Sequence, residues 1–148
     1  MAYKVVINTC YGGFCLSIKA EKLFWERKLG KEIFVYNSEN YDYTKVSDLS
    51  QLSEWNAHFT EIDFGENPDT IEELSIYRIE RHDPILVQVV EELGTEEASG
   101  ENARLKVKEI PCPMYKILDY DGAETIRIPF EEDDWTVIKE KRWQLEKY

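Results

Sequence analysis

The chain has 148 residues, of which 43% are hydrophobic, and a formal net charge of −12. The hydrophobic fraction excludes a disordered chain, and the negative charge argues against binding of duplex nucleic acid through the whole surface. We expect no membrane span and no leader peptide, because neither pattern occurs. Cys10, Cys15 and Cys112 are an odd number of thiols, a poor disulfide framework that favours a reducing compartment.

The charge is unevenly distributed along the chain. Residues 61–102 hold thirteen acids against two arginines, a net charge of −11. Residues 1–31, by contrast, hold six bases against Glu21 and Glu26. The sequence therefore predicts an acidic middle and a basic face that is open to a small anion or an acidic neighbour.

The first predicted elements are a strand, a glycine turn and a helix. Residues 3–8 are mostly β-branched and apolar, which predicts a short buried strand. Gly12 and Gly13 follow, and glycines permit a sharp turn at positive φ. Helical spacing of apolar residues then predicts an amphipathic helix between Ser17, a good N-cap, and Gly30, a good C-terminal stop.

The next part of the chain gives weaker signals. Residues 33–36 predict a second strand, and the polar and aromatic residues 37–43 predict a loop. Residues 47–55 predict a short helix, and residues 59–64 predict a strand. The apolar residues of 71–79 fit both the helical and the strand period, so this segment stays ambiguous.

The clearest helix signal covers residues 84–93. Asp83 is a good N-cap, proline occupies the first helical position, and Gly94 follows as a stop. The high apolar content of this helix predicts burial on more than one side. Residues 95–102 then read as a solvated link.

The last predicted elements are strands. Residues 104–110 alternate in polarity, which predicts a half-buried strand. Residues 114–120 and 125–130 flank Asp121-Gly122, a strong hairpin signal.

These elements predict an α/β (α+β) fold with a small mixed sheet, the N-terminal strand–glycine turn–helix unit, a central buried helix and a C-terminal hairpin. We expect a single domain over residues 1–130. An acidic and then mixed-charge C-terminal extension follows over residues 131–148.

Residues 8–14 are the best candidate for a binding site. A strand that leads through glycines into a helix start can expose backbone N–H groups to a bound phosphate or carboxylate. The alternative is that the glycines only make a tight turn while the aromatic residues fill the core. The spacing matches neither the dinucleotide nor the P-loop fingerprint.

A second candidate is the segment from Arg81 to Pro84. Arg81, His82 and Asp83 place three functional groups beside a helix start, where they could hold a nucleotide; in the alternative, Asp83 caps the helix and Arg81 pairs with an acid. We expect no metal site and no cofactor, because the chain has two histidines and no C-x-x-C pair. The cysteines lack neighbouring histidines and favour buried, unreactive thiols.

Five motifs form a joint pattern: residues 4–14 with Leu16-Ser17, Arg81 with Asp83-Pro84, residues 87–94, residues 105–107 with 109–111, and residues 120–122. Together these motifs resemble a widespread family of small, uncharacterised proteins of tailed bacteriophages and prophages. The similarity covers a third to a half of the chain, and the joint pattern is specific although each piece is short. This chain differs by having His82 after Arg81 and a longer, acidic tail.

The resemblance implies an accessory phage protein but brings no activity with it; for such a protein of this size we expect a role in countering host defence in the bacterial cytoplasm. The first hypothesis is sequestration of a small nucleotide signal without chemistry, with its phosphate on the glycine turn. The alternative is an acidic inhibitor or nucleic-acid mimic that presents residues 61–102 to a basic host enzyme, and a weaker one is a nucleotide hydrolase. A homo-oligomer is left open. The predicted ligand-binding residues are Asn8, Tyr11, Gly12, Gly13, Phe14, Ser17, Lys19, Lys22, Arg81 and Asp83.

Overall fold

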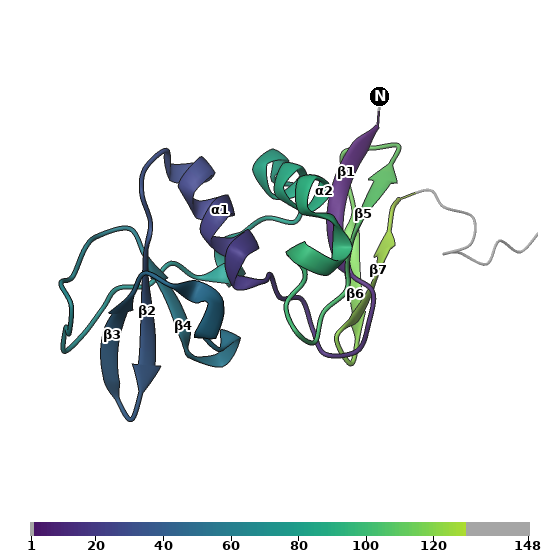
Figure 1. Cartoon of the computed structure of the whole chain (residues 1–148). Helices are drawn as coiled ribbons and strands as arrows, with labels where there is room; N and C mark the ends of the chain where they lie inside the picture. The colour runs from purple at the N-terminus through teal and green to yellow at the C-terminus, as the bar shows by residue number, and fades with distance from the viewer. Residues whose placement is uncertain (1, 130–148) are drawn as a thin grey trace, which may run out of the picture.

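The computed structural model describes residues 2–129, and the predicted extension over 131–148 lies outside this range. The predicted α/β class is confirmed (Figure 1). The elements are β1 (Tyr3–Asn8), α1 (Ile18–Leu29), β2 (Phe34–Glu39), β3 (Asp42–Val46), the short 3-10 turns η1 (Leu49–Gln51) and η2 (Glu54–Asn56), β4 (Ala57–Thr60), η3 (Ile76–Arg78), α2 (Pro84–Ala98), β5 (Leu105–Ile110), β6 (Lys116–Tyr120) and β7 (Ala123–Arg127).

The strands form three antiparallel sheets. β1 pairs with β5, β2 lies between β3 and β4, and β6 pairs with β7. Two of the pairs, β2–β3 and β6–β7, are hairpins of neighbouring strands, which are antiparallel by construction. The described strands are thus divided among separate small sheets instead of being gathered into one mixed sheet.

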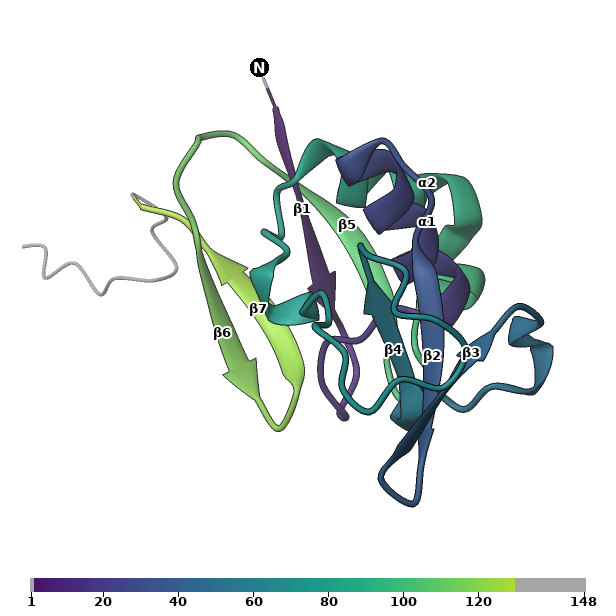
Figure 2. The same cartoon turned by 90° about the vertical axis from the view of Figure 1, so that its left-hand side faces the viewer.

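Helices α1 and α2 lie side by side (Figures 1 and 2). The β2–β3–β4 sheet lies on one side of them, and the β1–β5 and β6–β7 pairs lie on the other (Figure 1). Phe24 of α1 packs in one hydrophobic cluster with Leu86 and Val90 of α2, and with Val6 of β1 and Leu105 of β5. Because α2 contacts both α1 and the β1–β5 pair, its apolar residues are buried on more than one side, as the sequence predicts.

The predicted ends of α1 are confirmed. Ser17 is the N-cap, and its Oγ accepts a hydrogen bond from the backbone N–H of Ala20 at 3.1 Å. Gly30 ends the helix at φ 66°, a left-handed conformation that costs glycine little, and its N–H donates to Glu26 O at 2.9 Å. Local sequence chemistry therefore fixes both ends of this helix.

The predicted loop over residues 37–43 is wrong. Strand β2 continues to Glu39, β3 begins at Asp42, and only Asn40 and Tyr41 form the turn between them, with φ values of 53° and 70°. Positive φ at both turn residues is the geometry of a two-residue hairpin. The polar composition of this segment comes from solvent-facing positions of a hairpin and not from a loop.

Three other local predictions differ from the structure. The predicted helix over residues 47–55 is the pair of 3-10 turns η1 and η2, and the ambiguous residues 71–79 contain the short turn η3 and an isolated bridge from Glu73 to Thr60. Helical structure continues past Gly94, which itself has non-helical φ and ψ, to Ala98. Ala98 is fully buried in the main hydrophobic cluster, so the prediction of a solvated link over residues 95–102 is wrong. Core packing keeps the first half of this segment helical, and the polar residues around Ala98 give no sign of that packing.

Glu21 makes the stability of the fold dependent on pH. Its carboxylate accepts a hydrogen bond from Trp25 Nε1 at 3.2 Å, and burial raises its pKa to about 7. Between the ordinary pKa of about 4.5 and this raised value, the folded state holds a proton that the unfolded state has lost. We therefore expect the contribution of Glu21 to the free energy of unfolding to be fully present below pH 4.5 and to be lost as the pH rises to 7. The expected loss is on the order of 3 kcal/mol.

The measurement is urea unfolding of the wild type and the Glu21→Gln variant at several pH values between 4.5 and 7.5. The amide cannot ionise, so we expect this variant to lack the part of the decline that comes from Glu21. Glu96→Gln, which changes an exposed glutamate, is the matched control and should follow the wild type. Equal slopes in the two variants would contradict the assignment.

Candidate functional site

The glycine turn packs against the turn of the β6–β7 hairpin. Gly12 and Gly13 have φ values of 129° and 97°, and the Gly12 N–H donates to Asp121 O at 3.2 Å. Gly122 lies so close that an added Cβ would collide with the backbone nitrogens of both Gly12 and Gly13. The Gly12 amide is therefore engaged by a neighbouring backbone, and the Gly13 nitrogen lies against Gly122. The sequence-based hypothesis, by contrast, requires both amides to point outward at a guest.

The start of α1 is separated from the glycine turn and is covered by the end of α2. Ser17 donates from its N–H to Ala98 O at 2.9 Å and from its Oγ to Glu97 O at 2.6 Å. Lys19 Nζ lies 3.1 Å from Glu97 Oε1. Two carbonyl oxygens and a carboxylate at this helix start oppose the binding of an anion there.

Arg81 is engaged in a buried ion pair. Its guanidinium donates to both oxygens of Glu124, at 2.6 and 2.8 Å, and lies over the ring of Phe14, 3.7 Å from the centroid. Glu124, whose side chain is 4% exposed, also accepts the Asn8 N–H at 2.8 Å. The predicted charge partner for a phosphate is thus already neutralised by a carboxylate of β7.

The side chains of Asn8 and Asp83 are also engaged by other groups of the fold. Asn8 Nδ2 donates to Cys10 O and Gly122 O, each at 2.7 Å, and so ties β1 to the two turns. Asp83 caps α2 by accepting the Ile85 N–H at 2.8 Å and pairs with Lys28 at 2.7 Å. For Arg81 and Asp83 the structure shows the arrangement of the alternative interpretation, an ion pair and a helix cap.

A cavity of about 360 Å³ lies beside the glycine turn. It brings together four of the ten predicted ligand-binding residues, whereas Lys22 lines a different cavity beside β2 and β3. Its two carboxylates outnumber its one guanidinium, so its charge does not favour a phosphate. The lining residues are Gly12, Gly13, Phe14, Ile76, Tyr77, Ile79, Arg81, Asp119 and Glu124. Tyr11 is exposed and meets Tyr120 edge to face at 6.3 Å.

The predicted open basic face is wrong, because the N-terminal bases fold onto acids. Helix α1 lies against α2, and this places bases of one beside acids of the other. Lys22 pairs within its own helix with Glu26. The ion pairs to the acidic middle, at 2.7–3.1 Å, are Lys4–Glu91, Lys19–Glu97, Arg27–Glu92, Lys28–Asp83 and Lys31–Glu61.

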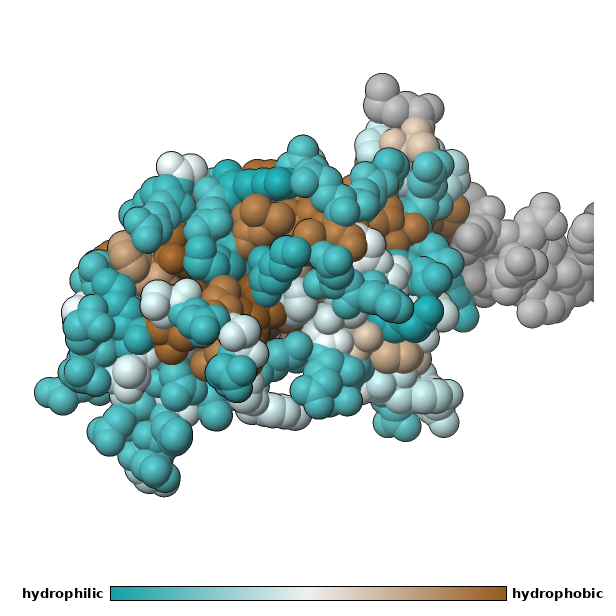
Figure 3. Space-filling model, viewed as in Figure 1, coloured by the Kyte–Doolittle hydropathy of each residue, from teal (hydrophilic) through white to brown (hydrophobic). Residues whose placement is uncertain are grey.

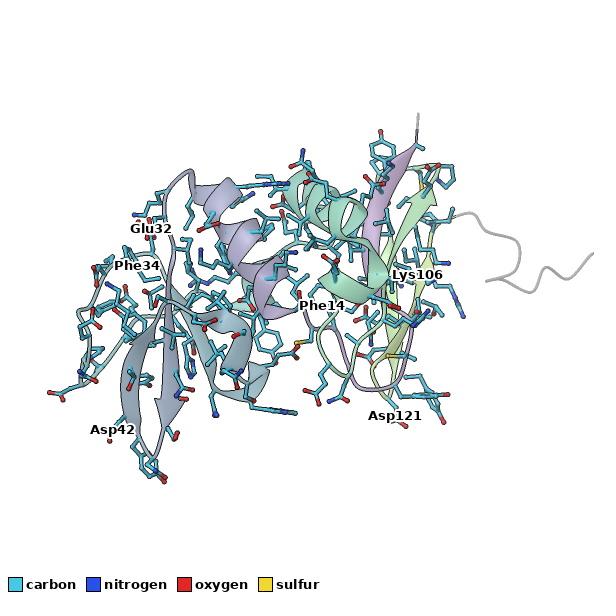
Figure 4. All side chains as sticks on the ribbon, viewed as in Figure 1. Phe14, Glu32, Phe34, Asp42, Lys106 and Asp121 are labelled. Carbon is cyan, nitrogen blue, oxygen red and sulfur yellow. The ribbon has the colours of Figure 1, made fainter. Side chains whose placement is uncertain are left out.

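Once the ion pairs are taken into account, the surplus negative charge is concentrated in a segment that only partly overlaps the predicted one. Residues 32–73, which we call the acidic lobe, hold eleven acids and one base, Lys45, whereas the rest of residues 2–129 holds thirteen acids and thirteen bases. The lobe contains β2, β3 and β4 and lies on one side of the helices (Figure 1). Asp42 marks its free end, far from Asp121 at the β6–β7 turn (Figure 4).

The surface of the acidic lobe is largely hydrophilic around the β2–β3 hairpin (Figure 3). Two large aromatic side chains are nevertheless exposed on the lobe: Tyr41 is fully exposed at the hairpin turn, and Trp55 is 80% exposed. Tyrosine and tryptophan are the residues that most often anchor protein interfaces. The lobe therefore combines excess negative charge with candidate anchor residues.

The structure also joins three residues that the sequence analysis did not connect. His58 of β4 lies 2.8 Å from Ser38 Oγ of β2 through Nε2, and 2.7 Å from Glu73 Oε2 through Nδ1. The residues are separated by 20 and 15 positions and match no short motif. Only the pairing of β2 with β4 and the return of the 61–75 segment bring them together.

Cys15 is not an alternative reactive site. Burial and the nearby Glu54 carboxylate raise the pKa of the Cys15 thiol to about 11, so Cys15 holds its proton at neutral pH and is a poor nucleophile. Over residues 2–129, no three histidine, cysteine, aspartate or glutamate side chains are grouped as a metal would require. None of the helices in this part of the chain is long and apolar enough to cross a membrane.

Comparisons with protein-family models, with curated proteins and with solved structures give no match to this chain. The resemblance to phage proteins therefore stays a prediction.

Proposed function

We propose that the chain acts by binding, and that the acidic lobe is the binding surface. The observation that carries this proposal is the distribution of charge: residues 32–73 have a net charge of −10, while the remaining described residues balance to zero. Within the lobe, Glu39, Asp42, Glu66, Asp69 and Glu72 are exposed carboxylates with no ion pair to a base of the described chain. Unpaired like charges repel one another within the lobe and create a negative potential that attracts a basic partner.

The chemistry of the lobe fits a partner with a basic surface, such as the nucleic-acid-binding face of an enzyme. Opposite charge on the two proteins raises the association rate and selects partners, and aromatic anchors add affinity at the centre of an interface. Tyr41 and Trp55 are available as such anchors. Taken with the resemblance to phage proteins, we propose an acidic inhibitor of a host defence enzyme in the bacterial cytoplasm.

The geometry gives less support to sequestration of a nucleotide signal. Its predicted phosphate site has amides that face backbone, a neutralised Arg81 and a cavity with more carboxylates than bases. That hypothesis stays a separate prediction. The acidic inhibitor is therefore the function that we put forward, with its surface moved from residues 61–102 to the acidic lobe.

We expect the protein to slow DNA cleavage by a non-specific endonuclease with a basic cleft. The test variant is Glu66→Gln, Asp69→Asn, Glu72→Gln, which removes three charges from the lobe. Because each such charge contributes about 0.5–1 kcal/mol to a complementary interface, we expect inhibition to weaken by roughly 10- to 100-fold at low salt. Raising the salt concentration should weaken inhibition by the wild type as well.

The matched control removes the same number of charges outside the lobe. The variant Glu96→Gln, Glu101→Gln, Glu109→Gln changes three exposed glutamates and leaves the lobe intact. We expect it to inhibit as the wild type does. Equal loss in the two triple variants would show that net charge alone matters, and failure of the wild type to inhibit a panel of such nucleases would overturn the proposal.

A further inference from the structure

We propose that Ser38, His58 and Glu73 form a nucleophile, base and carboxylate set that hydrolyses small activated acyl esters. This inference goes beyond the binding function above and does not depend on it. It rests on one juxtaposition: a serine hydroxyl, both ring nitrogens of a histidine and a glutamate carboxylate in one hydrogen-bonded chain, at 2.8 and 2.7 Å.

The order of the atoms matches the needs of a nucleophilic serine. An ionised carboxylate can only accept hydrogen bonds, so in the neutral imidazole Nδ1 carries the proton and donates to Glu73. Nε2 then has the free lone pair and accepts the Ser38 hydroxyl proton. This is the tautomer in which histidine can act as a general base toward serine.

The fold holds all three residues in place. Tyr36 is opposite His58 in the β2–β4 register, so Ser38 occupies a diagonal position on the same face of the sheet. Glu73 is bridged to Thr60, the last residue of β4. The ring of Tyr43 meets the His58 ring edge to face at 5.7 Å and fixes its orientation.

The set is accessible from solvent. The side chains of His58 and Glu73 are 21% and 50% exposed, and Ser38 is half-buried near the end of β2. Within residues 2–129, Ser38 Oγ has no hydrogen-bond partner other than His58. The hydroxyl is therefore not committed to the backbone and can attack an incoming carbonyl.

The surroundings select the substrate class. The set lies in the acidic lobe, whose eleven acids and one base give a net charge of −10. These carboxylates repel anions and attract cations. We therefore assign the site to esters with a neutral or cationic leaving group.

The reaction balances without any co-reactant except water. Ser38 Oγ attacks the ester carbonyl and its proton passes to His58 Nε2; the bond to the leaving alcohol breaks, and the alcohol departs with that proton. Water then attacks the acyl-serine, His58 takes the proton of the water and returns it to Ser38, and the carboxylic acid leaves. Glu73 is a positioning residue, because it contacts only His58 within the set.

The test is labelling of the full chain with a fluorophosphonate, whose phosphorus is attacked by an activated serine with loss of fluoride. Intact mass and peptide mapping should show one adduct, on Ser38. Ser38→Ala should abolish it, and His58→Gln should slow labelling by about 100-fold, the range expected for a lost general base. Ser47→Ala, which removes another exposed serine of the lobe, should label as the wild type does. No adduct on the wild type, or an adduct elsewhere, would overturn the proposal.

Two further measurements separate catalysis from a structural contact. Glu73→Ala should slow labelling of Ser38, and Glu73→Gln should restore part of the rate, since its amide oxygen can still accept the Nδ1 proton of His58; equal rates in the two variants would contradict the positioning role of Glu73. Three phenyl acetates should be compared: one with a trimethylammonium substituent, one without a substituent and one with a carboxylate substituent. The cationic ester should be hydrolysed fastest and the anionic ester slowest. A faster anionic ester would refute the substrate class. Failure of the wild type to inhibit nucleases would leave these results unaffected, so the two proposals can fail separately.

Discussion

Replacing Arg81 with alanine is expected to destabilise the protein by about 3–5 kcal/mol, because it leaves a buried carboxylate without its partner. Glu124 is 4% exposed, and both of its oxygens accept hydrogen bonds from Arg81. The change also removes the cation from the ring of Phe14. Urea unfolding, monitored by circular dichroism, measures the loss as a lower midpoint at an unchanged slope.

The matched control for this prediction is Lys4→Ala. Lys4 and Glu91 form an ion pair at 2.8 Å in which both side chains are exposed and screened by solvent, so its removal should lower the free energy of unfolding far less than Arg81→Ala does. If Arg81→Ala lowers the free energy of unfolding no more than Lys4→Ala does, the conclusion that the Arg81–Glu124 pair stabilises the fold as a buried ion pair is contradicted.

The expected loss also bears on tests of ligand binding. Arg81→Ala would lower thermal stability with or without a nucleotide, so it cannot by itself report on a lost ligand contact. Tyr77→Ala is the better variant for the cavity beside the glycine turn. Tyr77 lines that cavity, yet its side chain is 96% exposed and contributes little to the core.

Gly122→Ala is expected to destabilise the protein by about 4 kcal/mol or more. Gly122 has a φ of 90°, which strains any residue with a Cβ, and the new Cβ would also collide with the Gly12 and Gly13 nitrogens. The two turns would have to separate, with loss of the hydrogen bond from Gly12 to Asp121. The measurement is again the free energy of unfolding in urea.

Gly65→Ala separates the two causes of the expected destabilisation, the left-handed backbone conformation and the collision of the new Cβ. Gly65 has the same φ of 90°, but an added Cβ would meet nothing within 4 Å. This variant should therefore show only the cost of the left-handed conformation, about 1–2 kcal/mol. The difference between the two variants measures the close approach of the turns. If Gly122→Ala costs no more than Gly65→Ala, the packing of the glycine turn against the hairpin is contradicted.

The elements with strong local signals were predicted correctly from the sequence. Ser17 and Gly30 bound α1, Asp83 caps α2, and Asp121-Gly122 forms the turn of the C-terminal hairpin. Each of these features depends on hydrogen bonds or backbone angles within a few residues. The β2–β3 hairpin was missed because its turn residues, Asn40 and Tyr41, lack the glycine that usually marks such a turn.

The candidate site was predicted less well than the fold. The glycine turn was recognised as a turn, but its neighbours Gly122 and Asn102 come from distant parts of the chain. Because those neighbours decide whether an amide is exposed, the sequence could not show that the turn is closed. Ser38, His58 and Glu73 were not connected for the same reason, since their alignment depends on strand register.

The sequence by itself determined the composition, the surplus of acids and the helix ends, because these depend on residue type or on neighbours along the chain. The tertiary structure alone decided which of the acids have a basic partner and which do not. The packing of α1 against α2 pairs N-terminal bases with the acids that follow Asp83, and this leaves residues 32–73 as the uncompensated segment. Charges cancel according to distance in space, and the linear sequence does not contain that distance.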